Sequence, residues 1–573
     1  MSKILDVAVI GGGVAGTYCA WRLTGPQGLT ADGGADKRVA LFEYSDRIGG
    51  RLYTKTFPGM PNVAAELGGM RYIIPEKDDP TSNQPMVSNL IEALDLPSHV
   101  FLMGNPEPGA DGKPIGEKEN ILYLRGKHLL VKQQSDPAQV PYNLSWNERG
   151  KTVNDLQVFA MNLLVPNNQN LSLEQWMDTK VYGHPLYTYG FWNLMSQTLS
   201  SEAYQFMKDA GGYDANVANA NAVAQLPATE YANTDGFRAI TGGYQRLPLT
   251  LARQAAEQGA QIHMNRRLAK IEKGADGLYK LTFIVTETRL VDTTFGGVHE
   301  ETKDKDGAPP EIVHARDIIL GLPRRSLELI DWEGWEQKEV KEMLSSVLIQ
   351  DAFKLLLAYD YPWWRAMNLV AGRSITDLPV RQVYYFGTEE DQPGGEKGNT
   401  RSLMMASYND ITTVPFWKGL EHGPPFVGRR PKDVQPLAKE EAGATGDDQR
   451  VVPLADCVAT DAMVASAHQQ ILEVHGLVDV DKPYSAIYQD WSGDPYGGGW
   501  HEWKAGFRYN LLMPKIRQPL AAEKVYICGE AYSNNQGWVE GCLQTAEHVL
   551  RDKFKLPWPT YLTGLPPEKV LGP

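Results

Sequence analysis

Residues 5–24 read LDVAVIGGGVAGTYCAWRLT, an apolar run followed by a glycine turn and a stretch of small residues. An apolar strand that turns at glycines into a helix opens a dinucleotide-binding βαβ unit. Gly11 permits the tight turn, Gly13 lets a pyrophosphate approach the backbone, and Gly16 lets helix and strand pack closely. The second strand, "RVALFE", ends at Glu43, whose carboxylate can accept hydrogen bonds from ribose hydroxyls. This pattern favours a Rossmann-like dinucleotide site; the alternative is merely a tight strand–helix turn.

Length, charge and cysteine content narrow the class of protein. The 573 residues are enough for two or three joined domains. The 56 basic and 70 acidic residues give a net charge of −14, which disfavours nucleic acid and anionic membranes as partners. The four cysteines are scattered without metal-ligand spacing, so we expect reduced thiols and no metal site. The chain enters a strand at once and has no apolar run of about 18 residues, so we expect a soluble, cytoplasmic protein.

Directly after the second strand the chain reads EYSDRIGGRLYT, with Arg47, the pair Gly49–Gly50 and Arg51 close together. A glycine pair beside arginine offers a second backbone approach and a fixed charge for a pyrophosphate. The alternative is a turn with two solvated arginines.

The spacing E-x-x-x-R-x-G-G-R after GxGxxG resembles the flavin-dependent amine oxidase family. Residues 525–549, VYICGEAYSNNQGWVEGCLQTAEHV, resemble the C-terminal flavin segment of that family. The resemblance implies FAD as the cofactor.

The resemblance also implies roles for individual residues. Glu530 is expected to contact the ribityl–phosphate region, and the backbone of Leu268 to meet the adenine. A helix that begins at Val539 is expected to point its N-terminus at the isoalloxazine ring. The complete set of expected cofactor-binding residues is Gly11, Gly13, Ala15, Gly16, Glu43, Tyr44, Gly50, Arg51, Gly68, Gly69, Met70, Arg71, Leu268, Gly529, Glu530, Gly537, Trp538 and Val539.

The distribution of strand-like and helix-like segments predicts an α/β protein, α+β overall. We expect a Rossmann-like FAD-binding domain, a substrate domain built on a mixed sheet, and a helical insert. The predicted FAD-binding domain is discontinuous and comprises residues 1–75, 238–330 and 515–555. The substrate domain is predicted at 76–145 and 331–514, and the helical domain at 146–237. The proline-rich tail after residue 556 is expected to be extended or poorly ordered.

Two stretches suggest where the reaction takes place. Lys354 lies in the apolar run "FKLLLA", where the family has a lysine that holds a water near the flavin; the alternative is an ordinary lysine at a strand edge. The stretch "PYGGGWHEW" resembles the segment where monoamine oxidases carry a cysteine bonded to the flavin. Trp500 follows the glycines instead, so we expect non-covalent FAD. Trp538, next to Gly537, takes the second aromatic position, and both tryptophans could flank the substrate or simply pack in the core.

Arg71 lies in "ELGGMRYIIPEK", which resembles the stretch of L-amino acid oxidases in which an arginine holds the substrate α-carboxylate. A buried arginine needs an anion, and a bound carboxylate would supply it. The segment "LPVRQVYYF" also follows the L-amino acid oxidase pattern, closest to bacterial members. Tyr408 is the candidate for a tyrosine hydroxyl that assists Arg71. The alternative for Arg71 is a structural salt bridge.

The sequence therefore predicts an FAD-dependent L-amino acid oxidase that acts with O₂ and forms a 2-oxo acid, ammonia and hydrogen peroxide. Lys354, Arg71 and Trp538 are the expected catalytic residues. Asp214 and Glu502 are candidate partners for a basic or long polar substrate such as arginine, lysine or glutamine; the alternative is that both are surface acids. A homodimer or higher homo-oligomer is expected by analogy with the family.

Three other functions remain open from the sequence. The first is an amino acid 2-monooxygenase, which would use the same fold to give an amide. The second is an amine or polyamine oxidase, which would have no carboxylate for Arg71 to hold. The third is a flavin-binding protein without catalytic activity.

Overall fold

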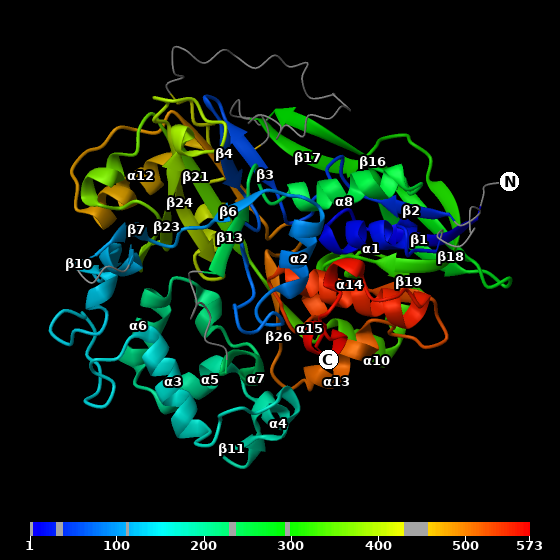
Figure 1. The fold of residues 1–573 in the computed structure, drawn as a ribbon, viewed down its shortest axis with the longest axis horizontal. Helices are drawn as coiled ribbons and strands as arrows, with labels where there is room; N and C mark the ends of the chain where they lie inside the picture. The colour runs from blue at the N-terminus through cyan, green and yellow to red at the C-terminus, as the bar shows by residue number, and fades with distance from the viewer. Residues whose placement is uncertain are drawn as a thin grey trace.

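The structure is a computed structural model that describes residues 4–29, 38–109, 114–227, 236–292, 298–428 and 457–572. In the described part of the chain, the strands form two large sheets and several small ones, with helices packed around them (Figure 1). The expected mixture of a Rossmann-like unit, a second sheet and a helical insert is confirmed. The assignment of residue ranges to three domains stays a prediction.

The first large sheet contains the predicted βαβ unit. Strand β1 pairs in parallel with β2 on one side and β18 on the other, and helix α1 connects β1 to β2. The sheet runs in the order β14 (Gln261–His263), β2 (Val39–Phe42), β1 (Leu5–Ile10), β18 (Glu311–Leu320), β16 (Tyr279–Asp292), β15 (Arg266–Lys273) and β19 (Asp331–Trp332), with β17 (Val298–Asp304) on β16 and β27 (Val525–Ile527) on β18. Strands distant in sequence therefore meet in one sheet.

Three helices cover one face of this sheet, and they too come from distant parts of the chain. Helix α1 (Val14–Thr24) packs against α8 (Arg246–Glu257) and α14 (Val539–Phe554). The α1–α14 contact includes a buried ion pair in which Arg22 Nη2 lies 3.0 Å from Glu547 Oε1. Helix α2 (Pro85–Ala93) lies against α14, where the carboxylate of Glu540 accepts the backbone N–H groups of Met86 and Val87.

The second large sheet lies on the other side of the molecule, beside α12 (Asp461–His475) in Figure 1. It runs in the order β10 (Lys127–Leu130), β9 (Ile121–Leu124), β22 (Gly372–Thr376), β23 (Gln382–Thr388), β24 (Ser402–Asp410), β21 (Ala352–Tyr359) and β25 (Ser485–Asp490). Every residue of β21 is buried, because α12 packs on one face of the sheet and the hairpin β3 (Thr54–Phe57) and β4 (Met60–Glu66) lies against the other. The apolar run around Lys354 is therefore a central strand.

The helical segment follows between residues 153 and 225. Its elements include α3 (Val153–Leu164), α4 (Leu173–Asp178), α5 (Phe191–Thr198), α6 (Ser201–Gly211), the 3₁₀ turn η4 (Asp214–Val217) and α7 (Ala222–Gln225). Thr152 and Ser172 start α3 and α4 with capping boxes. The small ladder of β20 (Val347–Gln350) and β26 (Trp500–Trp503) lies near this segment, and the bridge between Ala220 and Lys504 joins the two.

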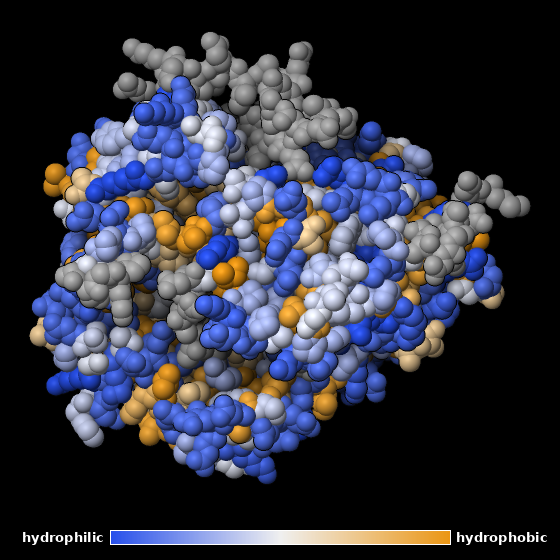
Figure 2. Space-filling view, in the orientation of Figure 1, coloured by the Kyte–Doolittle hydropathy of each residue, from blue (hydrophilic) through white to orange (hydrophobic). Residues whose placement is uncertain are grey.

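The prediction that the tail after residue 556 is extended or poorly ordered is wrong, because the tail packs against the helices of the first sheet. It contains η11 (Thr560–Leu562) and α15 (Pro567–Val570), and the side chains of Leu562, Val570 and Leu571 are buried. The Tyr561 hydroxyl lies 2.9 Å from that of Tyr18 on α1. Figure 2 shows a mainly hydrophilic face with scattered hydrophobic residues, as the acidic composition leads one to expect.

Candidate functional site

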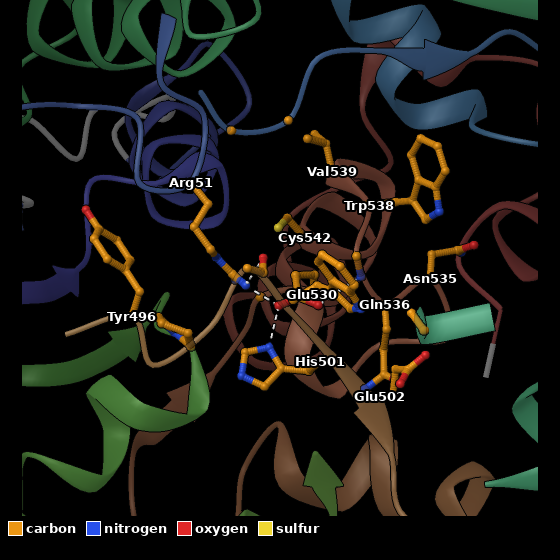
Figure 3. A pocket seen from close by; sticks show the side chains of 18 of the residues that line it. Arg51, Tyr496, His501, Glu502, Glu530, Asn535, Gln536, Trp538, Val539 and Cys542 are labelled. Atoms are coloured by element: carbon orange, nitrogen blue, oxygen red, sulfur yellow. Dashed lines mark hydrogen bonds and ion pairs between the residues drawn. The ribbon is translucent and has the colours of Figure 1, made fainter. Parts of the chain in front are cut away.

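A cavity of about 1000 Å³ lies where the first sheet, the second sheet and the helical segment meet. Its walls include the glycine turn of the βαβ unit, the segment 68–71, the strand β26 and the start of α14 (Figure 3). The helical segment contributes residues from α3, α4, α6 and α7 to the same space. One continuous cavity thus reaches both the dinucleotide motif and the residues expected to bind substrate.

The glycine turn forms one end of the cavity. Gly11 has φ +104°, a conformation that favours glycine, and Gly13 is the N-cap of α1. A Cβ on Gly13 would lie 3.9 Å from Gly50 Cα, and one on Gly50 only 3.2 Å from Gly13 Cα, so the two glycine segments pack closely against each other. Gly16 does not line the cavity; a Cβ there would lie 1.9 Å from the Gly11 carbonyl oxygen. Gly16 is therefore a packing glycine, as the motif predicts.

Glu43 lies at the end of β2 and lines the cavity. Its Oε2 accepts the Gly12 N–H at 2.6 Å, and its Oε1 accepts the Ser45 N–H at 2.9 Å. The carboxylate is thereby fixed beside the glycine turn. Tyr44 and Leu268 line the same end, together with Ala15.

Glu530 is the centre of a charge cluster in the wall of the cavity (Figure 3). Its carboxylate lies 2.8 Å from Arg51 Nη2 and 2.6 Å from His501 Nδ1, and it accepts the Gly537 N–H at 2.9 Å. Burial alone would raise the pKa of Glu530, but Arg51 and His501 outweigh it and lower the pKa to about 2. The cluster therefore keeps a fixed negative charge that ties Arg51 and β26 to the start of α14.

Lys354 lies behind the cavity wall and is not among the residues that line it. Its ammonium donates to the carbonyl oxygens of Glu66 at 3.2 Å and Gly68 at 2.5 Å, and lies 4.6 Å from the centre of the Tyr408 ring. Burial lowers the pKa of Lys354 to about 7. The lysine thus supports the segment that carries Gly68, Gly69, Met70 and Arg71, all four of which line the cavity.

Arg71 is 5% exposed and lines the cavity among aromatic rings. Its guanidinium carbon lies 4.7 Å from the centre of the Phe237 ring and 5.4 Å from that of Phe101. Its Nη1 donates to the Tyr384 hydroxyl at 3.4 Å. The prediction that Tyr408 supplies the hydroxyl beside Arg71 is therefore corrected: that hydroxyl belongs to Tyr384 of the neighbouring strand, and Tyr408 lines the cavity next to it.

The tryptophans expected to flank a substrate both line the cavity. Trp500 begins β26, and Trp538 is the N-cap of α14, which begins at Val539 as predicted. Gly537 has φ +78° and lies against the Trp500 side chain, since a Cβ there would be 3.6 Å from Trp500 Cβ. An aromatic wall and a helix N-terminus therefore adjoin the same part of the cavity (Figure 3).

Comparison with known proteins identifies the family. The family model described as flavin containing amine oxidoreductase matches residues 14–423. The chain belongs to the flavin containing amine oxidoreductase family. It is 27% identical to Aplysianin-A of Aplysia kurodai, with 96% of this chain and 91% of that protein covered. It is 22% identical to an L-amino-acid oxidase of Crotalus adamanteus, with 95% and 86% covered.

A solved structure shows the same fold. Wild-type putrescine oxidase bound to putrescine superposes with a TM-score of 0.59 at 15% identity, and the match covers 96% of this chain and 99% of that one. The resemblance seen in the sequence is therefore confirmed at the level of family and fold. This flavin amine oxidoreductase is a flavin-dependent enzyme that acts on amino groups, and FAD is its cofactor.

The residues of the glycine end fit FAD. Gly11, Gly13 and Gly50 line the cavity at the N-terminus of α1, where backbone N–H groups and the helix dipole favour a pyrophosphate. Glu43 lies one strand away, placed for ribose hydroxyls. All the residues expected to contact the cofactor line the cavity except Gly16, and their individual roles stay predictions.

The two acids proposed for a basic substrate side chain differ in position. Asp214 does not line the cavity, and its carboxylate contacts Arg381 Nη2 at 3.4 Å and the Thr412 N–H at 3.1 Å. A direct contact of Asp214 with substrate is therefore wrong. Glu502 lines the cavity, and its carboxylate accepts hydrogen bonds from the side-chain amides of Gln225 and Gln350.

Several cavity residues of this flavin amine oxidoreductase were not foreseen. Tyr213, Arg373 and Glu117 lie near Arg71, and His501 and Cys542 lie near Glu530. Arg373 Nε is 3.7 Å from a carboxylate oxygen of Glu117. No local motif marks these residues, because each reaches the cavity through long-range packing.

The expectation of a cytoplasmic protein is wrong, because relatives such as Aplysianin-A and the Crotalus L-amino-acid oxidase are secreted proteins. The scattered cysteines on which it rested do not decide the compartment. Among the described residues, no helix has the length and apolarity needed to cross a bilayer, and no cluster of metal-ligating side chains is present.

Proposed function

We propose that this chain is an FAD-dependent L-amino acid oxidase that releases a 2-oxo acid, ammonia and hydrogen peroxide. The observation that carries the proposal is Arg71, a buried guanidinium in the cavity wall with the Tyr384 hydroxyl beside it. A planar guanidinium binds a carboxylate through two parallel hydrogen bonds, and low local polarity strengthens the pair. An α-amino acid offers that carboxylate, whereas a simple amine does not.

The other cavity residues have complementary roles in this proposal. Trp500 and Trp538 confine the substrate side chain and Cα, and Arg71 fixes the carboxylate, so that the Cα–H bond is held in one orientation. FAD, when bound, supplies the hydride acceptor and the reaction with oxygen. Lys354 holds the segment 66–68 by its carbonyl oxygens and, in our proposal, orients a water on that side.

We also propose that FAD is bound non-covalently. The position after Gly499 is Trp500 rather than cysteine, and the cavity's own thiol, Cys542, has its pKa raised to about 12 by burial, which disfavours the reactive thiolate. Acid precipitation of the purified protein should release the yellow flavin into the supernatant. A pellet that stays yellow would contradict the proposal and point to Cys542.

The test of the reaction pairs each L-amino acid with the amine that lacks its carboxylate. L-Leucine, L-arginine, L-lysine and L-glutamine are assayed for peroxide and 2-oxo acid, with 3-methylbutylamine, agmatine, 1,5-diaminopentane and 4-aminobutanamide as the respective matched amines. One peroxide and one 2-oxo acid per turnover support the oxidase. An amide product without peroxide indicates the monooxygenase, and turnover of the amines alone indicates an amine oxidase.

Arg71→Ala then tests the carboxylate site. Loss of one partner of a buried, charged hydrogen-bonded pair costs about 2–5 kcal/mol, so kcat/KM for amino acids should fall by roughly 30- to 5000-fold. Arg125→Ala is the matched control, because Arg125 forms a partly exposed pair with Glu202 outside the cavity. Equal amino acid kinetics in Arg71→Ala and the wild type would exclude Arg71 from carboxylate binding.

The preference for basic or long polar side chains remains part of the proposal through Glu502 alone. Its position on the cavity wall supports a contact with a cationic side chain, although two glutamine amides already bind its carboxylate. In Glu502→Gln, the ratio of kcat/KM for arginine to that for leucine should fall. An unchanged ratio would remove Glu502 from substrate selection.

A further inference from the structure

Two buried aspartates join the helical segment to the second sheet. Asp410 ends β24, and its carboxylate oxygens accept the backbone N–H groups of Asp214 at 2.8 Å and Ala215 at 2.9 Å. In return, the carboxylate of Asp214 accepts the Thr412 N–H at 3.1 Å and lies 3.4 Å from Arg381 Nη2. Each aspartate thus binds the backbone of the other's segment. We call this arrangement the aspartate clasp.

The clasp lies in the interior. Asp410 is fully buried and Asp214 is 3% exposed. A buried carboxylate is costly unless hydrogen bonds or a cation compensate it. Two backbone N–H groups offset part of this cost for Asp410, whose pKa is still raised to about 7 by burial and by the neighbouring Asp214. Arg381 and Thr412 offset the cost for Asp214. Because each compensating donor must stay in place, the clasp fixes η4 relative to the end of β24.

The residue placed by the clasp is Tyr213, which immediately precedes η4 and lines the cavity. Its hydroxyl lies 3.2 Å from the hydroxyl of Tyr384, which itself accepts from Arg71 Nη1 at 3.4 Å. The Tyr213 ring packs edge-on against Tyr408 with centroids 5.1 Å apart, and the Arg373 guanidinium lies 5.5 Å from its centre. Contacts therefore run without a gap from the clasp to Arg71.

We propose that Asp410 and Asp214 are positioning residues whose clasp sets Tyr213 against Tyr384 and so orients Arg71 for the substrate carboxylate. The inference rests on the proposed amino acid oxidase function. It gives Asp214 a role through Tyr213 rather than through contact with substrate. The Tyr213 hydroxyl then contributes to substrate specificity, because it helps to orient Arg71, and Arg71 binds only substrates that carry a carboxylate.

The experiment compares Tyr213→Phe and Asp410→Asn with the wild type, using the amino acid that the wild type oxidises best and its decarboxylated amine. Tyr213→Phe removes one hydroxyl, and a single hydrogen bond corresponds to a change of roughly fivefold. We expect KM for the amino acid to rise by that factor with kcat within twofold. Asp410→Asn leaves one backbone N–H without an acceptor and should raise KM by roughly tenfold or more. The amine should be oxidised no differently by wild type and variants.

Asp209→Asn is the matched control, because Asp209 is a buried aspartate of α6 bonded to Tyr142 and away from the cavity. Its KM should equal that of the wild type at equal FAD content. An unchanged KM in Tyr213→Phe, or an equal change for the amine, would overturn the inference even if Asp410→Asn fails to fold. Failure of the proposed function would appear instead in the wild type, as an absence of peroxide with every L-amino acid tested.

Discussion

Replacing Glu530 by glutamine tests whether the charge cluster in the cavity wall stabilises the contact between α14 and β26. Glutamine has the shape of the protonated acid, so the substitution removes the charge with little change in packing. The fall in the pKa of Glu530 from 4.5 to about 2 measures how much its partners favour the charged form. At 1.36 kcal/mol per pH unit, that preference is about 3 kcal/mol, and no large correction for solvent is needed because Glu530 is buried.

The assay is native-state hydrogen exchange at pH 7, which reports the free energy of local opening amide by amide. The Gly537 N–H donates to Glu530, so its exchange should accelerate by roughly 300-fold in Glu530→Gln. Glu257→Gln is the control, because Glu257 pairs with Arg253 on the surface at 3.5 Å; it should leave the Gly537 rate unchanged. An acceleration below tenfold would refute this stabilising role.

The pH dependence of the same charge gives a second check on its sign. The folded-state pKa of Glu530 lies below its unfolded value, so its stabilising contribution is fully present above pH 4.5 and is lost as pH falls toward 2. The difference in exchange between wild type and variant should therefore be constant from pH 5 to 8. A difference that grew with pH across that range would contradict the assignment.

Three further predictions concern side-chain packing and the titration of a buried histidine. Gly16→Ala should lower both Tm and flavin content, because the added Cβ would clash with the backbone. Gly13→Ala should keep the near-UV circular dichroism of the wild type but lose affinity for FAD in a flavin titration. Burial lowers the pKa of His475 from 6.5 to about 4, so His475 should contribute a loss of about 3 kcal/mol in the free energy of unfolding as pH drops from 6.5 to 4. In urea titrations the loss over this range should be smaller by that amount in His475→Gln, and the loss that remains includes the contribution of His548, whose pKa burial also lowers to about 4. Leu562→Ala should destabilise the folded chain by about 2–5 kcal/mol in the same titrations, and a change below 0.5 kcal/mol would show that the tail is not part of the core.

The parts of the fold that the sequence predicts well are those with a contiguous signal. The strand, glycine turn and helix of residues 5–24 form a local pattern, and each glycine has a steric reason that a single sequence shows. The apolar run around Lys354 is likewise a contiguous signal, and it corresponds to strand β21, in which every residue is buried. The packing of the tail was missed because its apolar residues, such as Leu562 and Val570, lie among prolines and become part of the core only by packing on distant helices.

The details of the site depend on which distant segments meet, and a single sequence does not give that. Tyr384 and Tyr408 lie on neighbouring strands with rings 6.3 Å apart, so the choice of the hydroxyl beside Arg71 required the register of β23 and β24. Asp214 has the charge expected of a substrate-binding acid, but Arg381, remote in sequence, takes up that charge. Glu117 reached the cavity without any motif, through the short turn η1 (Glu117–Glu119).

The order of strands in the first sheet has a consequence for how the protein is made. Strand β27 pairs with β18, and α14 packs on α1. The predicted FAD site therefore combines the glycine turn that precedes α1 with the start of α14, two segments that are far apart in the sequence. During synthesis the glycine turn after β1 (Leu5–Ile10) emerges long before α14 (Val539–Phe554). The nascent chain must therefore hold an unfinished nucleotide site until α14 has been made, and tight capture of FAD becomes an event that coincides with closure of the fold.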